Sequence, residues 1–194
     1  MKNEYDRLSS FLDGVFTARQ LLARASQNGS FIESTCLLAS IIDAQLRIGI
    51  ILKHQIETES SEIPKDLLFQ KPKGKKFTER EIYKKALHSG TLDNDLFDEL
   101  SSLYDERNKI IHRYIISDIL TNHVLQIAIR YEKVEEKVRQ VIHDIESEQI
   151  RLGVGMTVEG PDPSDEEHRE LFRESALRKH GQEWLAQALD TSRS

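Results

Sequence analysis

The chain contains no proline between residues 1 and 63 and none between residues 73 and 160. A proline in a helix interior costs about 3 kcal/mol, so both stretches can form long helices. Apolar residues recur in them at intervals of three and four, and the alternation typical of strands is not found. The sequence therefore predicts an all-α protein, an antiparallel bundle of about five helices followed by a helical C-terminal tail.

Start and stop signals divide the bundle into its helices. An Asn-Gly pair at 28–29 should end the first helix, and capping boxes at 30–33 (Ser-x-x-Glu) and 78–81 (Thr-x-x-Glu) should begin two others. The expected helices are 5–27, 31–56, 78–87, 94–111 and 121–148. The second is apolar on more than one side, so it should be the most buried. Within it, Asp43 and Arg47 are expected to form an internal ion pair or a polar link to a neighbouring helix, because buried charges need partners.

The last helix of the bundle carries a sustained seven-residue repeat. Its apolar positions alternate steps of three and four: Val124, Ile127, Tyr131, Val134, Val138, Val141 and Ile145. Such a stripe most often packs inside its own bundle, which is the first interpretation. The alternative is a seam between two subunits.

Composition changes divide the chain into two parts. The bundle occupies 1–152 and contains a lysine-rich loop insertion at 59–77. Glycines and prolines mark a linker after residue 152, and a third capping box, Ser-x-x-Glu at 164–167, begins a short amphipathic helix. Residues 153–194 are therefore interpreted as a linker and C-terminal helical tail, which docks on the bundle, reaches a partner or stays mobile.

Composition also excludes several classes of protein. The net charge of −6 argues against non-specific coating of DNA, which needs many phosphate contacts. A single cysteine, Cys36, excludes a disulfide framework, and no histidine has a recognised metal-ligand spacing, so no metal or cofactor is expected. The longest run of large apolar residues and glycine, 48–52, is too short to span a bilayer, and the N-terminus has no secretory apolar stretch. We expect a cytoplasmic protein with no membrane partner.

The most informative segment is 105–114, Asp-Glu-Arg-Asn-Lys-Ile-Ile-His-Arg-Tyr. It holds Arg107, Asn108, His112 and Tyr114 in an Arg-x4-His-x-Tyr pattern. Cleavage of RNA without a metal needs a base for the ribose 2′-hydroxyl, and histidine titrates near neutral pH. It also needs a cation beside the phosphate, and arginine offers paired donors to phosphate oxygens.

This segment resembles the signature of the HEPN superfamily (higher eukaryotes and prokaryotes nucleotide-binding), all-α bundles that include many ribonucleases and toxins. Arg107, Asn108 and His112 match the signature, and Tyr114 matches the extended form in HEPN toxins paired with a nucleotidyltransferase antitoxin. The helix order is also similar to that of HEPN-like mannitol-operon repressor proteins. The resemblance covers residues 5–149 and implies a HEPN-like bundle.

The resemblance implies a metal-independent endoribonuclease, as the toxin of a toxin–antitoxin or phage-defence system. Arg107 would stabilise the phosphate, His112 would act as base or acid, Asn108 would position one of them, and Tyr114 would be a site of regulatory modification. The implied partners are single-stranded or tRNA-like RNA, a second copy in a homodimer, and an antitoxin protein. Cations of the insertion and of the motif helix are candidates for contacting RNA: Lys73, Lys75, Lys76, Lys109 and Arg113. The alternative is a non-catalytic HEPN-like interaction module or the partner of a transcriptional regulator.

Helix geometry places a condition on this site. Arg107 and His112 are five residues apart, so on a regular helix they point about 140° apart. Either the helix ends or bends near Ile111, or two subunits contribute, as the resemblance implies. An ordinary interpretation also remains, because cations are favoured near the C-terminus of any helix.

Overall fold

The structure is a computed structural model that describes residues 4–68, 76–159 and 164–180. Its elements are α1 (Glu4–Gln27), α2 (Phe31–Thr58), α3 (Lys65–Leu68), α4 (Glu79–His88), α5 (Asn94–Arg113), the 3-10 turn η1 (Tyr114–Ile116), α6 (Thr121–Leu152) and α7 (Asp165–His180). No strand occurs among these residues, which confirms the all-α class. Helix α6 is four residues longer than expected and ends at Gly153, whose φ of +67° supplies a left-handed cap.

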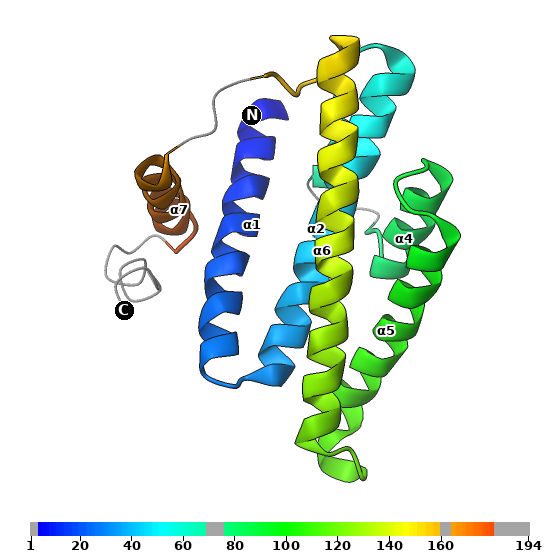
Figure 1. Cartoon of the computed structure of the whole chain (residues 1–194), viewed down its shortest axis with the longest axis vertical. Coiled ribbons are helices and arrows are strands. Elements are labelled where there is room, and N and C mark those ends of the chain that lie inside the picture. The colour runs from blue at the N-terminus through cyan, green and yellow to red at the C-terminus, as the bar shows by residue number, and fades with distance from the viewer. Residues whose placement is uncertain (1–3, 69–75, 160–163, 181–194) are drawn as a thin grey trace.

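Helix α2 lies at the centre of the bundle. It packs against α1, α6, α4 and α5, so apolar residues on several of its sides are buried, as the sequence predicts. Figure 1 shows α1 on one side of the α2–α6 pair and α4 and α5 on the other. By length and composition α2 could cross a membrane, but its apolar residues face other helices of the bundle, which is typical of a core helix.

The repeat on α6 faces the core of its own bundle. Five of its seven residues are buried and the other two, Ile127 and Val141, are half-buried against the same core. Helix α6 makes its main contact with α2. The first interpretation of the stripe is therefore confirmed for this chain, and the side chains of the repeat are not available as a seam between subunits.

Two of the three capping boxes form. In the Thr78 and Ser164 boxes, the hydroxyl and the glutamate three residues later exchange hydrogen bonds with backbone amides. The prediction for Ser30 is wrong, because its side chain makes no capping hydrogen bond. The turn there is fixed instead by the end of α1: Gly29 has a φ of +65°, and the amide of Ser30 donates to the carbonyl of Ala25 at 2.8 Å, a Schellman-type closure.

Helix α2 contacts the described part of the insertion through Arg47. Arg47 pairs with Asp43 at 2.6 Å, as expected, and its Nη1 donates to the carbonyl of Leu67 in α3 at 3.0 Å. Residues 69–75 of the insertion lie outside the described part of the chain.

The tail helix α7 docks on α1. Arg178 donates to both carboxylate oxygens of Asp13 at 2.8 and 2.9 Å, and Ser175 is buried in the contact. Figure 1 shows α7 beside α1, on the side of the bundle away from α5. The described part of the tail therefore does not cover the motif segment.

Candidate functional site

Arg107 is held inside the bundle by Glu79. Its Nη1 donates to Oε2 and Oε1 of Glu79 at 2.7 and 2.9 Å, and only 11% of its side chain is exposed. Its Nη2 donates to Oδ1 of Asn108 at 3.2 Å, and the guanidinium lies 5.0 Å from the ring centre of Tyr104. The arginine of the motif is thus neutralised by a carboxylate from α4.

Glu79 is the centre of a polar cluster between α4, α5 and α6. It stands in the first turn of α4, and it also accepts a hydrogen bond from the hydroxyl of Tyr83. Tyr131 of α6 is fully buried beside the pair. Two atoms of this cluster are buried without a hydrogen-bond partner, Nε of Arg107 and the hydroxyl of Tyr131. The cluster is therefore well satisfied around the carboxylate and incompletely satisfied at Nε of Arg107 and at the hydroxyl of Tyr131.

The electrostatics of the cluster favour the charged form of Arg107 beside Glu79. Burial disfavours the charged form of Arg107, but Glu79 more than offsets this and raises the pKa of the guanidinium. Burial raises the pKa of the Tyr131 hydroxyl and of the Cys36 thiol as well. Cys36 is therefore a protonated thiol near neutral pH and does not have the low pKa of a nucleophilic cysteine.

His112 lies on the opposite side of α5 from Arg107. We call Leu100, Leu103, Arg107 and Ile110 the inner face of α5, and Asn108, Lys109, His112 and Arg113 its outer face. Lys109, His112 and Arg113 are exposed and Asn108 is half-buried. Since α5 is helical through Arg113, no bend near Ile111 brings Arg107 and His112 together within one chain. A joint site of Arg107 and His112 would therefore need a second subunit, and the ordinary interpretation of the two residues needs none.

Tyr114 begins the 3-10 turn that follows α5. It is half-buried, and its hydroxyl shares a hydrogen bond with that of Thr121 at 2.7 Å. It also lines a hollow of about 440 Å³ together with residues of the α1–α2 turn. Modification at its oxygen would remove the proton that Tyr114 can donate to Thr121.

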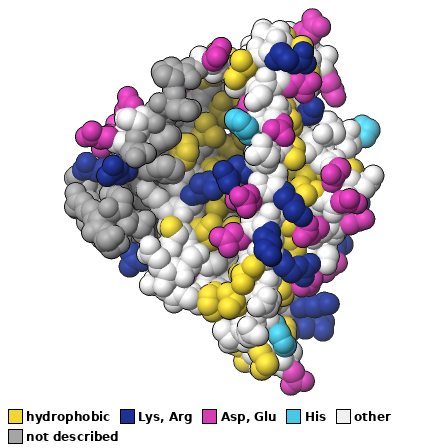
Figure 2. Space-filling model, in the orientation of Figure 1, with side chains coloured by type: hydrophobic (Ala, Val, Ile, Leu, Met, Phe, Trp, Pro, Cys, Tyr) yellow, Lys and Arg dark blue, Asp and Glu magenta, His cyan; other side chains and the backbone are white. Residues whose placement is uncertain are grey.

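The cations proposed for RNA binding have different surroundings. Lys76 is exposed just before α4, and Lys109 and Arg113 are exposed on α5. Lys73 and Lys75 lie outside the described residues. In Figure 2, Lys and Arg side chains alternate with Asp and Glu over α6, so this view shows no continuous basic surface. No group of three or more His, Cys, Asp or Glu residues that could hold a metal occurs in the described part of the chain.

The partners of Arg107 are the residues that sequence reasoning missed. Leu100, Leu103, Arg107 and Ile110 follow one another in steps of three, four and three, so the spacing places Arg107 on a buried stripe. A buried arginine needs a carboxylate, and this requirement is the signal that could have pointed toward a partner such as Glu79. Tyr83 follows Glu79 by four residues on α4, so the spacing identifies Tyr83 once Glu79 is known.

Comparisons with known proteins assign no family to this chain. No family model, no curated protein and no solved structure matches it. The function must therefore be argued from the residues and their geometry.

Proposed function

We propose that this chain is a metal-independent endoribonuclease of HEPN type whose site is completed by a second copy of the chain. The observation that carries the proposal is the outer face of α5. His112 and Asn108 are four residues apart and share one side of the helix, and Lys109 and Arg113 are exposed beside them. A histidine with adjacent cations can take up a ribose and the phosphate that follows it.

The chemistry follows from these groups. His112 accepts the proton of the ribose 2′-hydroxyl, and the 2′-oxygen attacks the phosphorus. The bond to the 5′-oxygen of the next nucleotide breaks, and that oxygen leaves with the proton that His112 took from the 2′-hydroxyl. The products are a 2′,3′-cyclic phosphate and a 5′-hydroxyl. Lys109 and Arg113 stabilise the negative charge that accumulates on the phosphate oxygens.

An apolar surface beside the outer face supports a homodimer. Four large apolar residues are 45–94% exposed where α5 ends and α6 begins: Ile111, Ile115, Ile116 and Leu120. Several exposed large apolar residues close together in the sequence are consistent with an interaction site. In the proposal this apolar surface packs against the same surface of a second copy and brings two outer faces together. An antitoxin partner belongs to the same proposal through the resemblance, and a cytoplasmic location belongs to it through the sequence composition.

Arg107 distinguishes this proposal from the second candidate. For Nη1 of its guanidinium to bind phosphate, the phosphate must displace Glu79, because the carboxylate accepts from both N–H groups of Nη1. A non-catalytic interaction module needs no such exchange, and the Arg107–Glu79 pair then serves only to hold α4 against α5. The ion pair therefore favours the second candidate, and the exposed His112 favours the first.

The test is incubation of the full chain with mixed RNA in EDTA. Native protein and the His88→Ala variant should cleave, and His112→Ala should lose 10²- to 10⁴-fold in rate. His88 is the matched control because it is also an exposed histidine in the last turn of its helix. An RNA with 2′-deoxyribose at every position should remain intact.

Two further outcomes decide between the candidates. Cleavage that survives His112→Ala contradicts the proposed site. No cleavage by native protein that is folded, dimeric and unmodified at Tyr114 supports the interaction module. Glu79→Gln then tests Arg107: tighter RNA binding is expected if phosphate and Glu79 compete for the guanidinium, and unchanged binding if Arg107 is structural.

A further inference from the structure

A groove between α1, α2 and α3 lies on the side of the bundle away from α5, and α7 forms its edge. Its volume is about 690 Å³, within the range of ligand sites. Most of its lining is apolar, namely Phe11, Val15, Ala18, Ile41, Ala44 and Leu68. All of these except Ile41 are only half-buried, so the groove leaves apolar surface uncovered in the described structure.

The charges of the groove all have one sign. Among the described residues, Arg7 and Lys179 line it and no Asp or Glu does, although the chain as a whole carries a net charge of −6. The nearest carboxylate of the α1–α7 contact, Asp13, already accepts from Arg178 through both oxygens. An anionic group in the groove would therefore meet the Lys179 amine and no competing carboxylate from its described lining.

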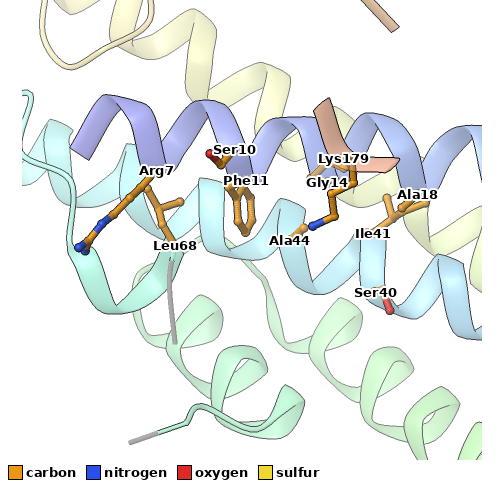
Figure 3. Close-up of a pocket in the computed structure, with 11 residues that line it drawn as sticks. Arg7, Ser10, Phe11, Gly14, Ala18, Ser40, Ile41, Ala44, Leu68 and Lys179 are labelled. Atoms are coloured by element: carbon orange, nitrogen blue, oxygen red, sulfur yellow. The ribbon is translucent and has the colours of Figure 1, made fainter. Parts of the chain in front are cut away.

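Lys179 is an exposed residue of α7 whose side chain lines the edge of the groove. Figure 3 shows its side chain reaching from α7 between α1 and α2, with the amine toward Ala44 and Gly14 beside it. The Lys179 amine lies 3.7 Å from the position that a Cβ atom on Gly14 would occupy. The Arg178–Asp13 pair, one residue away, fixes this part of α7 on α1 and so fixes the base of the Lys179 side chain.

We propose that this groove binds the free anion of a long-chain carboxylic acid. Its hydrocarbon chain lies along Phe11, Ile41 and Leu68, and its carboxylate pairs with the Lys179 amine. Apolar burial supplies most of the affinity and the charge pair selects the anion over a neutral amphiphile. No step of this proposal depends on ribonuclease activity.

The test is titration of the full chain with 11-(dansylamino)undecanoic acid, followed by dansyl fluorescence. Saturable binding of one probe per chain is expected, with displacement by dodecanoate and at least tenfold weaker displacement by dodecanol. Lys179→Met should weaken probe binding about tenfold. Ala44→Phe should abolish it by filling the groove. Lys84→Met, which removes an exposed lysine on α4, is the matched control and should bind like the native chain.

Several results would overturn the proposal. These are the absence of saturable binding, equal displacement by dodecanol, or native-like binding by both Lys179→Met and Ala44→Phe variants with helical content intact by circular dichroism. Binding to phosphatidylglycerol vesicles but not to the monomeric probe would assign the groove to a membrane surface instead. Binding that appears only in the Trp184→Ala variant would assign it to the chain's own C-terminal residues.

Discussion

Arg107 and His112 belong to one motif on one helix, and their surroundings differ as much as those of a core and a surface residue. Arg107 stands on the inner face of α5, with 11% of its side chain exposed and a carboxylate on its paired donors. His112 stands on the outer face with no partner among the described residues. The ion pair gives Arg107 a structural explanation, whereas no contact of the described residues explains His112, and the outer face is therefore the stronger indication of function.

The largest expected effect is a difference in the free energy of unfolding between variants on the inner and outer faces of α5. Arg107→Ala leaves Glu79 partly buried without its cation, and it should lower the free energy of unfolding by about 3 kcal/mol. His112→Ala removes an exposed side chain and should change it by less than about 0.5 kcal/mol. Urea denaturation followed by circular dichroism measures both. Equal losses for the two variants would show that the inner and outer faces are not distinct.

Two tyrosines of the cluster provide a second, smaller test. Tyr83→Phe removes a hydrogen bond to the charged Glu79 and should lower the free energy of unfolding by about 1.5 kcal/mol. Tyr131→Phe removes a buried hydroxyl that has no partner, so stability should stay within about 0.5 kcal/mol or rise. The same denaturation measurement compares them. A large loss for Tyr131→Phe would indicate that this hydroxyl has a partner in solution, such as a buried water.

Local patterns in the sequence account for the helices and for part of the site. The proline distribution, the Asn-Gly stop and the repeat on α6 predict the bundle because each acts on neighbouring residues or on one helix face. The Ser30 prediction fails because a backbone closure at Gly29 takes the place of the side-chain cap. The Arg107–Glu79 pair joins residues 28 positions apart, and no local pattern specifies which of several carboxylates α4 and α5 will bring to Arg107.

The Arg178–Asp13 pair of the tail can be compared with the Arg107–Glu79 pair. In both, the arginine binds both oxygens of a carboxylate, but the arginine of the tail is much more exposed. Arg178 binds both oxygens of Asp13, but 48% of the arginine side chain is exposed. Asp13→Asn should therefore cost about 1 kcal/mol or less at pH 7, well below the loss for Arg107→Ala.

The pH dependence of the same pair has a definite sign. Hydrogen bonds from Arg178 lower the pKa of Asp13 below its usual 3.8, although burial opposes this. The folded chain thus binds fewer protons at Asp13 than the unfolded chain. The stabilisation is complete above the usual pKa and is lost as the pH falls through the lowered one. Urea denaturation of native protein and Asp13→Asn should give curves that converge in acid; a gap that widens there would contradict the assignment.

The smallest effect on stability is expected on the outer face, where the effect on RNA should be clear. The Lys109→Ala, Arg113→Ala double variant should unfold within about 0.5 kcal/mol of the native chain, because both side chains are exposed. If both cations contact RNA backbone, affinity for single-stranded RNA should fall, and the slope of log affinity against log salt should decrease by about 0.7 for each lost contact. Fluorescence anisotropy at several salt concentrations measures the slope. An unchanged slope would remove the outer face from the proposed RNA site, and the contrast with Arg107 would then reflect burial alone.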